Sequence, residues 1–341
     1  MPAFATADEV TEAARSALPT ELWDYVSGGG GTEITLRRNR SALDSVCFRP
    51  RVARDVSDTR ADTTVLGIEC SAPVLLAPIG TIGLFDAGGA ATCARAAARA
   101  GTAAFVSILS TPSLEEVAAT GAPLIYQHYT RGSRAWTLDL FRRAEASGYR
   151  AICVTVDSPV DGLRERELRH RFDRGKAQAQ PNLGRDARRE LQAELTWSEI
   201  AWLAEQTELP LLLKGVTHPE DAVLALEAGV AALIVSNHGG RQLDAQLGAV
   251  EVLPGVVEAV GGRAEVLVDG GFERGGDVVK ALALGARAVL IGRAMCLSLA
   301  AGGEDTLVET LARLQEEVSR TLALLGVSTP GAVSREYLVG G

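Results

Sequence analysis

Residues 236–244 read Ser-Asn-His-Gly-Gly-Arg-Gln-Leu-Asp and follow directly on an apolar run, residues 231–235. The imidazole of His238 ordinarily titrates near neutral pH, so it is a candidate general base. The guanidinium of Arg241 is permanently charged, and its planar N–H donors suit a substrate carboxylate. The alternative is a plain strand-to-loop turn with a structural histidine, which for a lone His-Gly pair would be about equally favoured. The complete run favours an active site instead.

The elements that must position these residues are eight short β-like runs separated by helix-like stretches. The predicted strands cover residues 74–77, 102–107, 124–129, 151–157, 211–214, 231–236, 265–269 and 288–291. The predicted helices cover residues 89–100, 114–120, 133–147, 197–205, 219–227, 249–260 and 275–284, with a last helical region over 293–301 and 304–325. Eight strands, each followed by a helix, predict an α/β fold of the (β/α)₈ TIM-barrel type. An open doubly wound sheet does not need eight such units, and no G-x-G-x-x-G pattern follows the first strand.

Two segments lie outside the barrel count. Residues 1–72 form an N-terminal extension, where a capping-box pattern from Thr6 to Glu9 predicts a helix and a second helical turn precedes four glycines. Residues 158–196, after the fourth strand, are polar and rich in Arg, Glu, Gln and Ala. A long polar loop on the catalytic face predicts a lid or mobile excursion, with a plain surface loop as the alternative. Residues 1–341 are then expected to form a single domain.

Composition narrows the class of protein. With 341 residues, 47% hydrophobic and 23% charged, the chain is ordinary for a globular protein. The net charge is −9 and basic residues are spread out, so no nucleic-acid or anionic membrane partner is expected. The absence of an apolar leader or an 18-residue apolar stretch predicts a cytoplasmic protein. Five scattered cysteines predict buried reduced thiols and no metal site: Cys47, Cys70, Cys93, Cys153 and Cys296.

Polar residues stand at the carboxyl end of nearly every predicted strand. Because side chains alternate along a strand, Gln127 and Tyr129 share one face and His128 points the other way. The same argument places Ser236 and His238 on one face. The carboxyl ends of barrel strands carry active sites, so these positions together predict a functional site. The set comprises Ser107, Gln127, Tyr129, Thr155, Asp157, Lys214, Ser236, His238, Asp269 and Arg293.

The loops after the seventh and eighth strands predict a phosphate site. Residues 269–277 and 291–293 combine glycines with helix starts, where backbone N–H groups and the helix dipole favour an anion, and Arg293 adds a fixed charge. The glycines could also be simple turns. A planar heteroaromatic ring with carbonyls and ring nitrogens is the predicted occupant of the neighbouring polar positions: Ser107, Gln127, Thr155 and Lys214.

The chain resembles the FMN-dependent α-hydroxy acid oxidases and dehydrogenases, the family of glycolate, lactate and mandelate or hydroxymandelate oxidases. The resemblance covers nearly the whole chain, and residues 236–244 carry the specific signature of the family. Matching blocks lie at residues 18–25, 126–129, 155–157, 213–215, 267–271, 280–285 and 291–293. It implies a (β/α)₈ domain that binds FMN, and a homotetramer as relatives commonly form.

The resemblance also implies roles for individual residues. His238 is similar to the catalytic base and Asp157 to its orienting carboxylate, and Tyr129 is implied near the reacting oxygen. Substrate-binding positions are matched by Tyr25, Tyr129, Arg164, His238 and Arg241. FMN-binding positions are matched by Pro78, Ile79, Gly80, Ser107, Gln127, Thr155, Lys214, Ser236, Asp269, Gly270, Gly271, Phe272, Glu273, Gly292 and Arg293.

The implied reaction converts an (S)-2-hydroxy acid to the 2-oxo acid, with electrons passing to FMN and then to O₂, which forms H₂O₂, or to another acceptor. Glu273 stands where the family usually has arginine, which predicts weaker FMN binding. Thr81 and Leu109 replace bulkier pocket residues and predict a large or aryl substrate. Asp161, at an often apolar position, either faces a polar or cationic substituent or is a solvated loop carboxylate. Two other hypotheses are a different FMN barrel enzyme, such as an isomerase, and a degenerate non-catalytic barrel.

Overall fold

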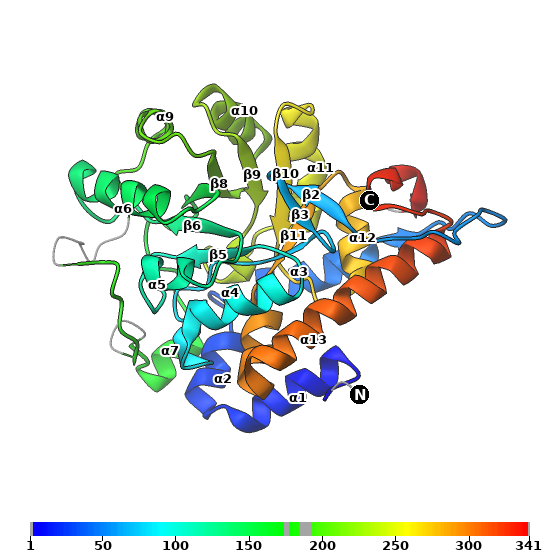
Figure 1. Cartoon of the computed structure of the whole chain (residues 1–341), viewed down its shortest axis with the longest axis horizontal. Helices are drawn as coiled ribbons and strands as arrows, with labels where there is room; N and C mark the ends of the chain where they lie inside the picture. The colour runs from blue at the N-terminus through cyan, green and yellow to red at the C-terminus, as the bar shows by residue number, and fades with distance from the viewer. Residues whose placement is uncertain (1–2, 174–176, 185–191, 340–341) are drawn as a thin grey trace.

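Eight parallel strands close into a barrel in the order β10-β11-β4-β5-β6-β7-β8-β9. This computed structural model describes residues 3–173, 177–184 and 192–339 (Figure 1). The closed barrel of eight parallel strands confirms the predicted (β/α)₈ fold. The barrel strands are β4 (Val74–Leu76), β5 (Ala104–Ser107), β6 (Leu124–His128), β7 (Ala151–Thr155), β8 (Leu211–Val216), β9 (Ala232–Val235), β10 (Glu265–Asp269) and β11 (Ala288–Ile291).

The strands are mostly apolar because both faces of the sheet are buried, with polar side chains chiefly at their carboxyl ends. Alternate residues such as Ile125, Leu212 and Leu267 belong to one cluster that fills the barrel. Their neighbours, such as Tyr126 and Leu213, pack in a second cluster under the surrounding helices. An antiparallel hairpin, β2 (Thr63–Val65) with β3 (Ile68–Cys70), adds Val65, Ile68 and Cys70 to the inner cluster. The hairpin was not predicted, and it covers the amino ends of the strands, opposite the functional face.

The helices surround the barrel close to the predicted bounds. They are α4 (Gly89–Arg99), α5 (Leu114–Ala118), α6 (Arg134–Ala146), α9 (Trp197–Glu205), α10 (Pro219–Glu227), α11 (Ala249–Val260), α12 (Gly275–Ala283) and α13 (Arg293–Leu325). Within α13 the backbone leaves helical geometry at Gly302 and Gly303, so the two predicted helical parts are separated there. Figure 1 shows α13 lying along α1.

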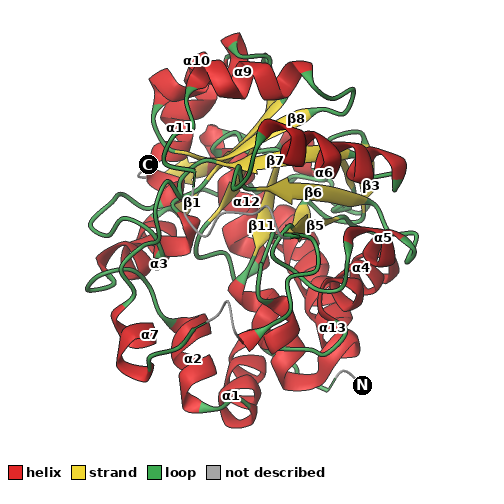
Figure 2. Cartoon of the chain, turned by 90° about the vertical axis from the view of Figure 1, so that its left-hand side faces the viewer, coloured by secondary structure: helices red, strands yellow, loops and turns green. Residues whose placement is uncertain are grey.

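The N-terminal extension supplies three helices: α1 (Ala7–Ala17), α2 (Thr20–Ser27) and α3 (Ile34–Ser45). The hydroxyl of Thr6 accepts a hydrogen bond from the backbone N–H of Glu9, as the capping pattern predicted. Helix α3 was not predicted. Figure 2 shows α2 beside α7 (Glu165–His170), which belongs to the excursion after β7. The extension also carries β1 (Cys47–Phe48), which pairs with β12 (Leu338–Val339).

Side-chain amides attach the described parts of the 158–196 excursion to the barrel. The Gln178 amide nitrogen donates to the backbone oxygens of Gly80 at 2.9 Å and Leu109 at 3.2 Å. The Gln192 side-chain oxygen accepts from the backbone N–H of Thr130 at 3.0 Å. The excursion therefore packs on the loops at the carboxyl ends of the strands. Residues 174–176 and 185–191, part of the predicted lid, lie outside the described residues.

The prediction of buried reduced thiols holds for four of the five cysteines and is wrong for Cys47. All five thiols are free, but Cys47 is exposed because it lies in the two-residue edge strand β1. In the described ranges, no group of three or more His, Cys, Asp or Glu residues could hold a metal ion. None of the described helices has the length and apolar character needed to cross a membrane.

Candidate active site

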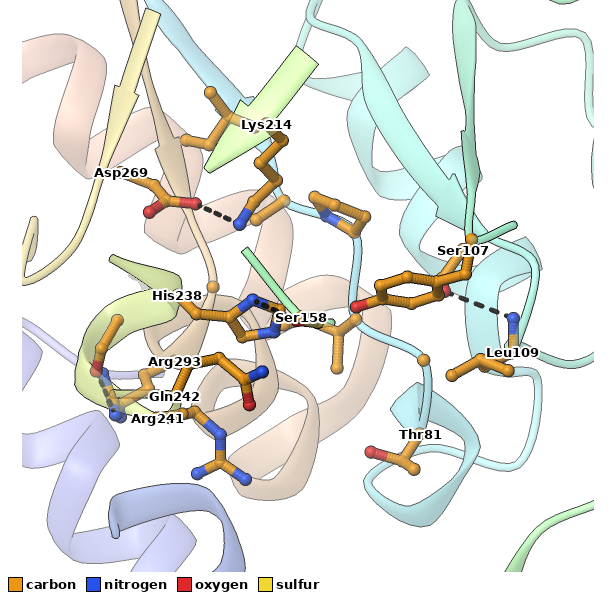
Figure 3. Close-up of a pocket in the computed structure, with 18 of the residues that line it drawn as sticks. Thr81, Ser107, Leu109, Ser158, Lys214, His238, Arg241, Gln242, Asp269 and Arg293 are labelled. Atoms are coloured by element: carbon orange, nitrogen blue, oxygen red, sulfur yellow. Dashed lines mark hydrogen bonds and ion pairs between the residues drawn. The ribbon is translucent and has the colours of Figure 1, made fainter. Parts of the chain in front are cut away.

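A cavity of about 570 Å³ lies at the carboxyl ends of the barrel strands. Figure 3 shows Lys214 and Asp269 on one side of His238, Arg241 and Arg293 on another, and Thr81 and Leu109 together at a distance from them. Four of the residues singled out in the sequence do not line the cavity but are buried or half-buried behind its wall: Gln127, Thr155, Asp157 and Ser236. The other residues that received a role from the sequence line it: Tyr25, Pro78, Ile79, Gly80, Thr81, Ser107, Leu109, Tyr129, Asp161, Arg164, Lys214, His238, Arg241, Asp269, Gly270, Gly271, Phe272, Glu273, Gly292 and Arg293.

His238 reaches the cavity through loop geometry. The strand β9 ends at Val235, and His238 begins the short 3₁₀ helix η2 (His238–Gly240) with a left-handed φ of 57°. Its backbone N–H donates to the hydroxyl of Ser236 at 3.0 Å. Strand alternation was therefore the wrong reason for its placement. A non-glycine residue in this region of φ costs about 1–3 kcal/mol, which the surrounding structure must supply.

The imidazole of His238 is paired with a carboxylate. Its Nδ1 lies 2.9 Å from Oδ1 of Asp157. Burial lowers the pKa of His238 below its ordinary value; Asp157 opposes this shift, and Lys214 and Arg164 add to it. Burial acts to raise the pKa of Asp157, but His238 and Lys214 outweigh it and the pKa is lowered. At neutral pH the pair is therefore a neutral imidazole beside a carboxylate, and a proton arriving on His238 would be stabilised by Asp157.

Gly215 makes room for Asp157. The strand β8 does not end at Lys214, as predicted, but continues to Val216 with a register shift between these two residues. Gly215 has a φ of 113°, and a Cβ atom built on it would lie 2.5 Å from Cβ of Asp157. A side chain there would both strain the backbone and displace the carboxylate that holds His238.

Gly215→Ala is expected to lower the free energy of unfolding by about 2–4 kcal/mol, because it combines a disfavoured φ with a steric clash. Chemical denaturation monitored by circular dichroism measures the change. Gly121→Ala is the matched control, since Gly121 also has a positive φ but open space around the added Cβ. Equal losses in the two variants would contradict the role given to the contact with Asp157.

Two guanidinium groups face the cavity and share one carboxylate. Arg164 donates through Nε to the backbone oxygen of Arg241 at 3.1 Å. Oε1 of Glu167 lies 3.3 Å from Nη1 of Arg164 and 3.1 Å from Nη2 of Arg241. Arg241 also donates through Nη1 to the backbone oxygens of Tyr25 at 2.6 Å and Gly28 at 2.9 Å. The two forks are thus held together, as a carboxylate clamp requires.

Sequence reasoning missed Glu167. It follows Arg164 by three positions on α7, and this spacing brings side chains together on one helix face. That spacing was the available signal. The contact with Arg241 could not be read from spacing, because the two residues are 74 positions apart.

The opposite side of the cavity carries a buried cation. Nζ of Lys214 lies 2.9 Å from Oγ of Ser236 and 3.0 Å from Oδ2 of Asp269. Burial alone would lower the pKa of Lys214, but Asp269 and Asp157 outweigh it and raise the pKa above its ordinary value, so the ammonium stays charged. Within the described part of the chain, buried Oγ1 of Thr155 and Oδ1 of Asp269 find no hydrogen-bond partner. Such orphaned polar atoms beside a cavity fit a bound group rich in nitrogen and oxygen.

The phosphate end differs from the expectation at one helix. The backbone N–H groups of Glu273 and Arg274 donate to Oδ2 of Asp277 at 3.2 and 3.1 Å, and that of Gly275 donates to Oε2 of Glu317 at 2.6 Å. The start of α12 is therefore already capped by two carboxylates. The first turn of α13, together with Gly270 and Gly271, is the remaining place for an anion.

Arg293 is also engaged by the protein. Its Nε donates to the backbone oxygen of Val26 at 3.1 Å, and its Nη2 donates to those of Gly28 at 3.1 Å and Gly239 at 2.8 Å. Burial lowers its pKa, which Glu273 opposes. Arg293 thereby ties the end of α2 to the loop that carries His238, in addition to lining the cavity.

The remaining histidines have structural contacts. His128 is fully buried with its Nδ1 2.9 Å from the hydroxyl of Tyr126, and burial lowers its pKa to about 3. It points away from the cavity, as predicted. His170 contacts Asp24 at 2.8 Å, and the Nδ1 of His218 caps α10. Cavity-lining residues that received no role from the sequence are Ala77, Arg131, Ser158, Asp173, Gln180, Leu183, Gly239, Gln242 and Leu290.

Fold and site together define an α/β barrel with a polar cavity at the carboxyl ends of its strands, and comparison with known proteins gives the family. Residues 14–340 match the family described as FMN-dependent dehydrogenase. The chain is 40% identical to L-lactate oxidase of Nostoc sp. (97% of this chain, 96% of that protein). It is 41% identical to 4-hydroxymandelate oxidase of Amycolatopsis orientalis (96% of each). A mandelate oxidase structure with benzoyl-formic acid has a TM-score of 0.92 at 40% identity, over 98% of each chain.

The chain belongs to the FMN-dependent dehydrogenase family, so it is an enzyme and its cofactor is FMN. A variant of an active chimera of (S)-mandelate dehydrogenase is equally similar in fold, with a TM-score of 0.94 at 34% identity over 98% of this chain and 99% of that one. The family resemblance expected from the signature is thereby confirmed.

Proposed function

We propose that the protein oxidises an (S)-2-hydroxy acid to the 2-oxo acid, with His238 as base and Arg164 with Arg241 as the carboxylate clamp. The observation that carries the proposal is that His238, paired with Asp157 at 2.9 Å, lines the same cavity as both guanidiniums. A base beside a carboxylate site suits proton removal from a hydroxy acid. This arrangement, with relatives that are oxidases and a dehydrogenase, favours oxidation over an isomerase or a non-catalytic barrel.

FMN, when bound, would accept the two electrons that leave the substrate. The cavity, the orphaned Oγ1 of Thr155 and the cation of Lys214 fit a flavin. A positive charge beside the ring stabilises the negative charge of a reduced flavin, which is the role proposed for Lys214. The groups proposed to hold the cofactor are Pro78, Ile79, Gly80, Ser107, Gln127, Thr155, Lys214, Ser236, Asp269, Gly270, Gly271, Phe272, Glu273, Gly292 and Arg293.

The protein residues would position the substrate and move one proton. The clamp fixes the substrate carboxylate, and Tyr25 and Tyr129 supply hydroxyls close to it. Because Nδ1 of His238 faces Asp157, the proton is taken up at Nε2. The arrangement supplies orientation, which lowers activation barriers by several kcal/mol.

The proposed substrate is large, with an aryl side chain as the first choice. Thr81 and Leu109 line the cavity, and the hydroxyl of Tyr25 lies 2.5 Å from Oγ1 of Thr81. Two similar proteins are named for mandelate or hydroxymandelate, which are aryl hydroxy acids. Asp161 lines the same cavity and is exposed, so it would contact a polar or cationic substituent.

The chain is further proposed to act as one FMN-binding unit over residues 1–341, with residues 158–196 as the lid. The excursion carries Arg164, which supports this assignment. Assembly as a homo-oligomer stays a prediction from the resemblance.

Anaerobic mixing of the FMN-loaded protein with a panel of 2-hydroxy acids tests the reaction. Aryl (S)-2-hydroxy acids are expected to bleach the flavin faster than glycolate or lactate, and the (R) forms to leave it oxidised. Readmission of air should restore the colour with one H₂O₂ per turnover, if O₂ is the acceptor as in the similar oxidases. A flavin that stays oxidised with every acid of the panel would refute the proposed function.

A further inference from the structure

One part of the cavity wall contains a carboxylate where an anion is expected. Glu273 lines the cavity together with Gly270, Gly271, Gly292 and Arg293. Gly270 and Gly271 have φ values of 110° and 87°, and this backbone can approach a ligand closely. The 33-residue helix α13 begins here as well. These are the features of a phosphate-binding end, and Glu273 adds a negative charge to them.

The positive charges around Glu273 are engaged by other acceptors. Arg40, on α3, lies 2.7 Å from both carboxylate oxygens of Asp277 and 2.7 Å from Asp44. Arg274 lies 3.1 Å from Asp8. Arg293 is held by three backbone oxygens, as described above. Among the described residues, no ion pair to Glu273 forms, so its charge is poorly compensated.

The start of α12 does not compensate the negative charge of Glu273 either. Asp277 and Glu317 already accept its backbone N–H groups, and Asp277 brings a second carboxylate close to Glu273. The Glu273 side chain is accessible from the cavity, yet the surrounding protein removes part of its hydration. This burial raises the pKa of Glu273, and the nearby Asp277 adds to the shift. The positive charges of Arg40, Arg274 and Arg293 oppose the shift but do not outweigh it.

We propose that Glu273 faces the phosphate of bound FMN, and that FMN reaches full affinity only when this carboxyl group carries a proton. The inference rests on the proposed placement of FMN in this cavity. The consequence is selectivity that changes with pH: the protein distinguishes FMN from riboflavin, which lacks the phosphate, well in mild acid and poorly at neutral pH.

The direction of this pH dependence follows from the charges of Glu273 and the phosphate. A phosphate monoester carries about −1.5 to −2 charges at pH 7, so an ionised Glu273 repels it, while the protonated form can donate a hydrogen bond to it. FMN therefore binds the protonated state more tightly, and its dissociation constant rises with pH through the pKa of Glu273 in the flavin-free protein. Since burial raises the pKa of Glu273 above its ordinary value, the rise in the dissociation constant is displaced to higher pH than an ordinary glutamate would give.

Flavin titrations of the full-length protein after removal of bound flavin test the proposal, with flavin fluorescence as the readout. From pH 5.5 to pH 8 the dissociation constant of FMN is expected to rise about tenfold or more, while that of riboflavin changes little. Glu273→Gln should tighten FMN binding at pH 8 about tenfold and flatten its pH dependence. Glu251→Gln is the matched control, because Glu251 pairs with Arg38 and does not line the cavity.

The second ionisation of the FMN phosphate, near pH 6, also changes the charge of the ligand over this range, and any effect of it that does not involve Glu273 would persist in Glu273→Gln. A pH dependence that is equal in wild type and Glu273→Gln would overturn the proposal. Riboflavin binding reports whether each variant is folded, and Glu273→Ala provides a second removal of the carboxylate with the same expected result. These dissociation constants involve no hydroxy acid, so failure of the proposed oxidation would be seen separately, in the anaerobic reduction.

Discussion

His238→Ala is expected to slow reduction of the flavin by an (S)-2-hydroxy acid by about 10²–10⁴-fold, the usual contribution of a positioned general base. The variant should keep its yellow colour, because His238 is proposed to contact the substrate and not to hold FMN. The rate of bleaching after anaerobic mixing in a stopped-flow instrument measures the effect. The loss should appear in the reduction rate at saturating substrate, since the clamp arginines still bind the carboxylate.

His218→Ala is the matched control for this experiment. Its imidazole caps α10 away from the cavity, so the variant should lose at most about 1 kcal/mol of stability and none of the reduction rate. The reduction rate of Asp157→Asn should fall between those of His238→Ala and His218→Ala. This variant keeps the imidazole but removes the charge that stabilises its protonated form. If His238→Ala were bleached by substrate as fast as the wild type, the base would have to be another group.

Arg241→Lys is expected to raise the apparent KM for the hydroxy acid about 10–100-fold. The substitution keeps the positive charge but loses the planar fork, and a hydrogen bond to a charged group contributes about 1.5–3 kcal/mol. The dependence of the anaerobic reduction rate on substrate concentration measures the change. A second signature is selectivity: the wild type should prefer a hydroxy acid over its neutral amide strongly, and the variant should do so much less.

Arg166→Lys controls for a general effect of replacing an ion-paired arginine by lysine. Arg166 pairs with Glu33 at 2.6 Å and does not line the cavity, so its KM should stay near that of the wild type. Flavin absorbance must be compared as well, because Arg241 also holds the backbone oxygens of Tyr25 and Gly28. An unchanged preference for the acid over the amide in Arg241→Lys would exclude Arg241 from the clamp.

Much of the barrel could be predicted because its signals are local. Strands such as β10 and β11, and helices such as α10 and α11, have the predicted bounds, since apolar runs, glycines and caps are read over a few neighbouring residues. Other elements gave no such signal. The hairpin of β2 and β3 is stabilised by packing its apolar side chains against the inner cluster of the barrel, and α3 packs against α11 and η2.

The amino-acid sequence by itself determined the eightfold alternation of strand and helix, the family signature, and the set of polar groups that gather at the strand ends. Only the tertiary structure decided the left-handed φ of His238, the bridge of Glu167 between Arg164 and Arg241, and the capping of α12 by Glu317 from α13. The physical reason is distance along the chain. Periodicity and capping act between near neighbours, whereas the contacts of Glu167 with Arg241 and of Glu317 with Gly275 join residues 74 and 42 positions apart and exist only after the barrel has closed.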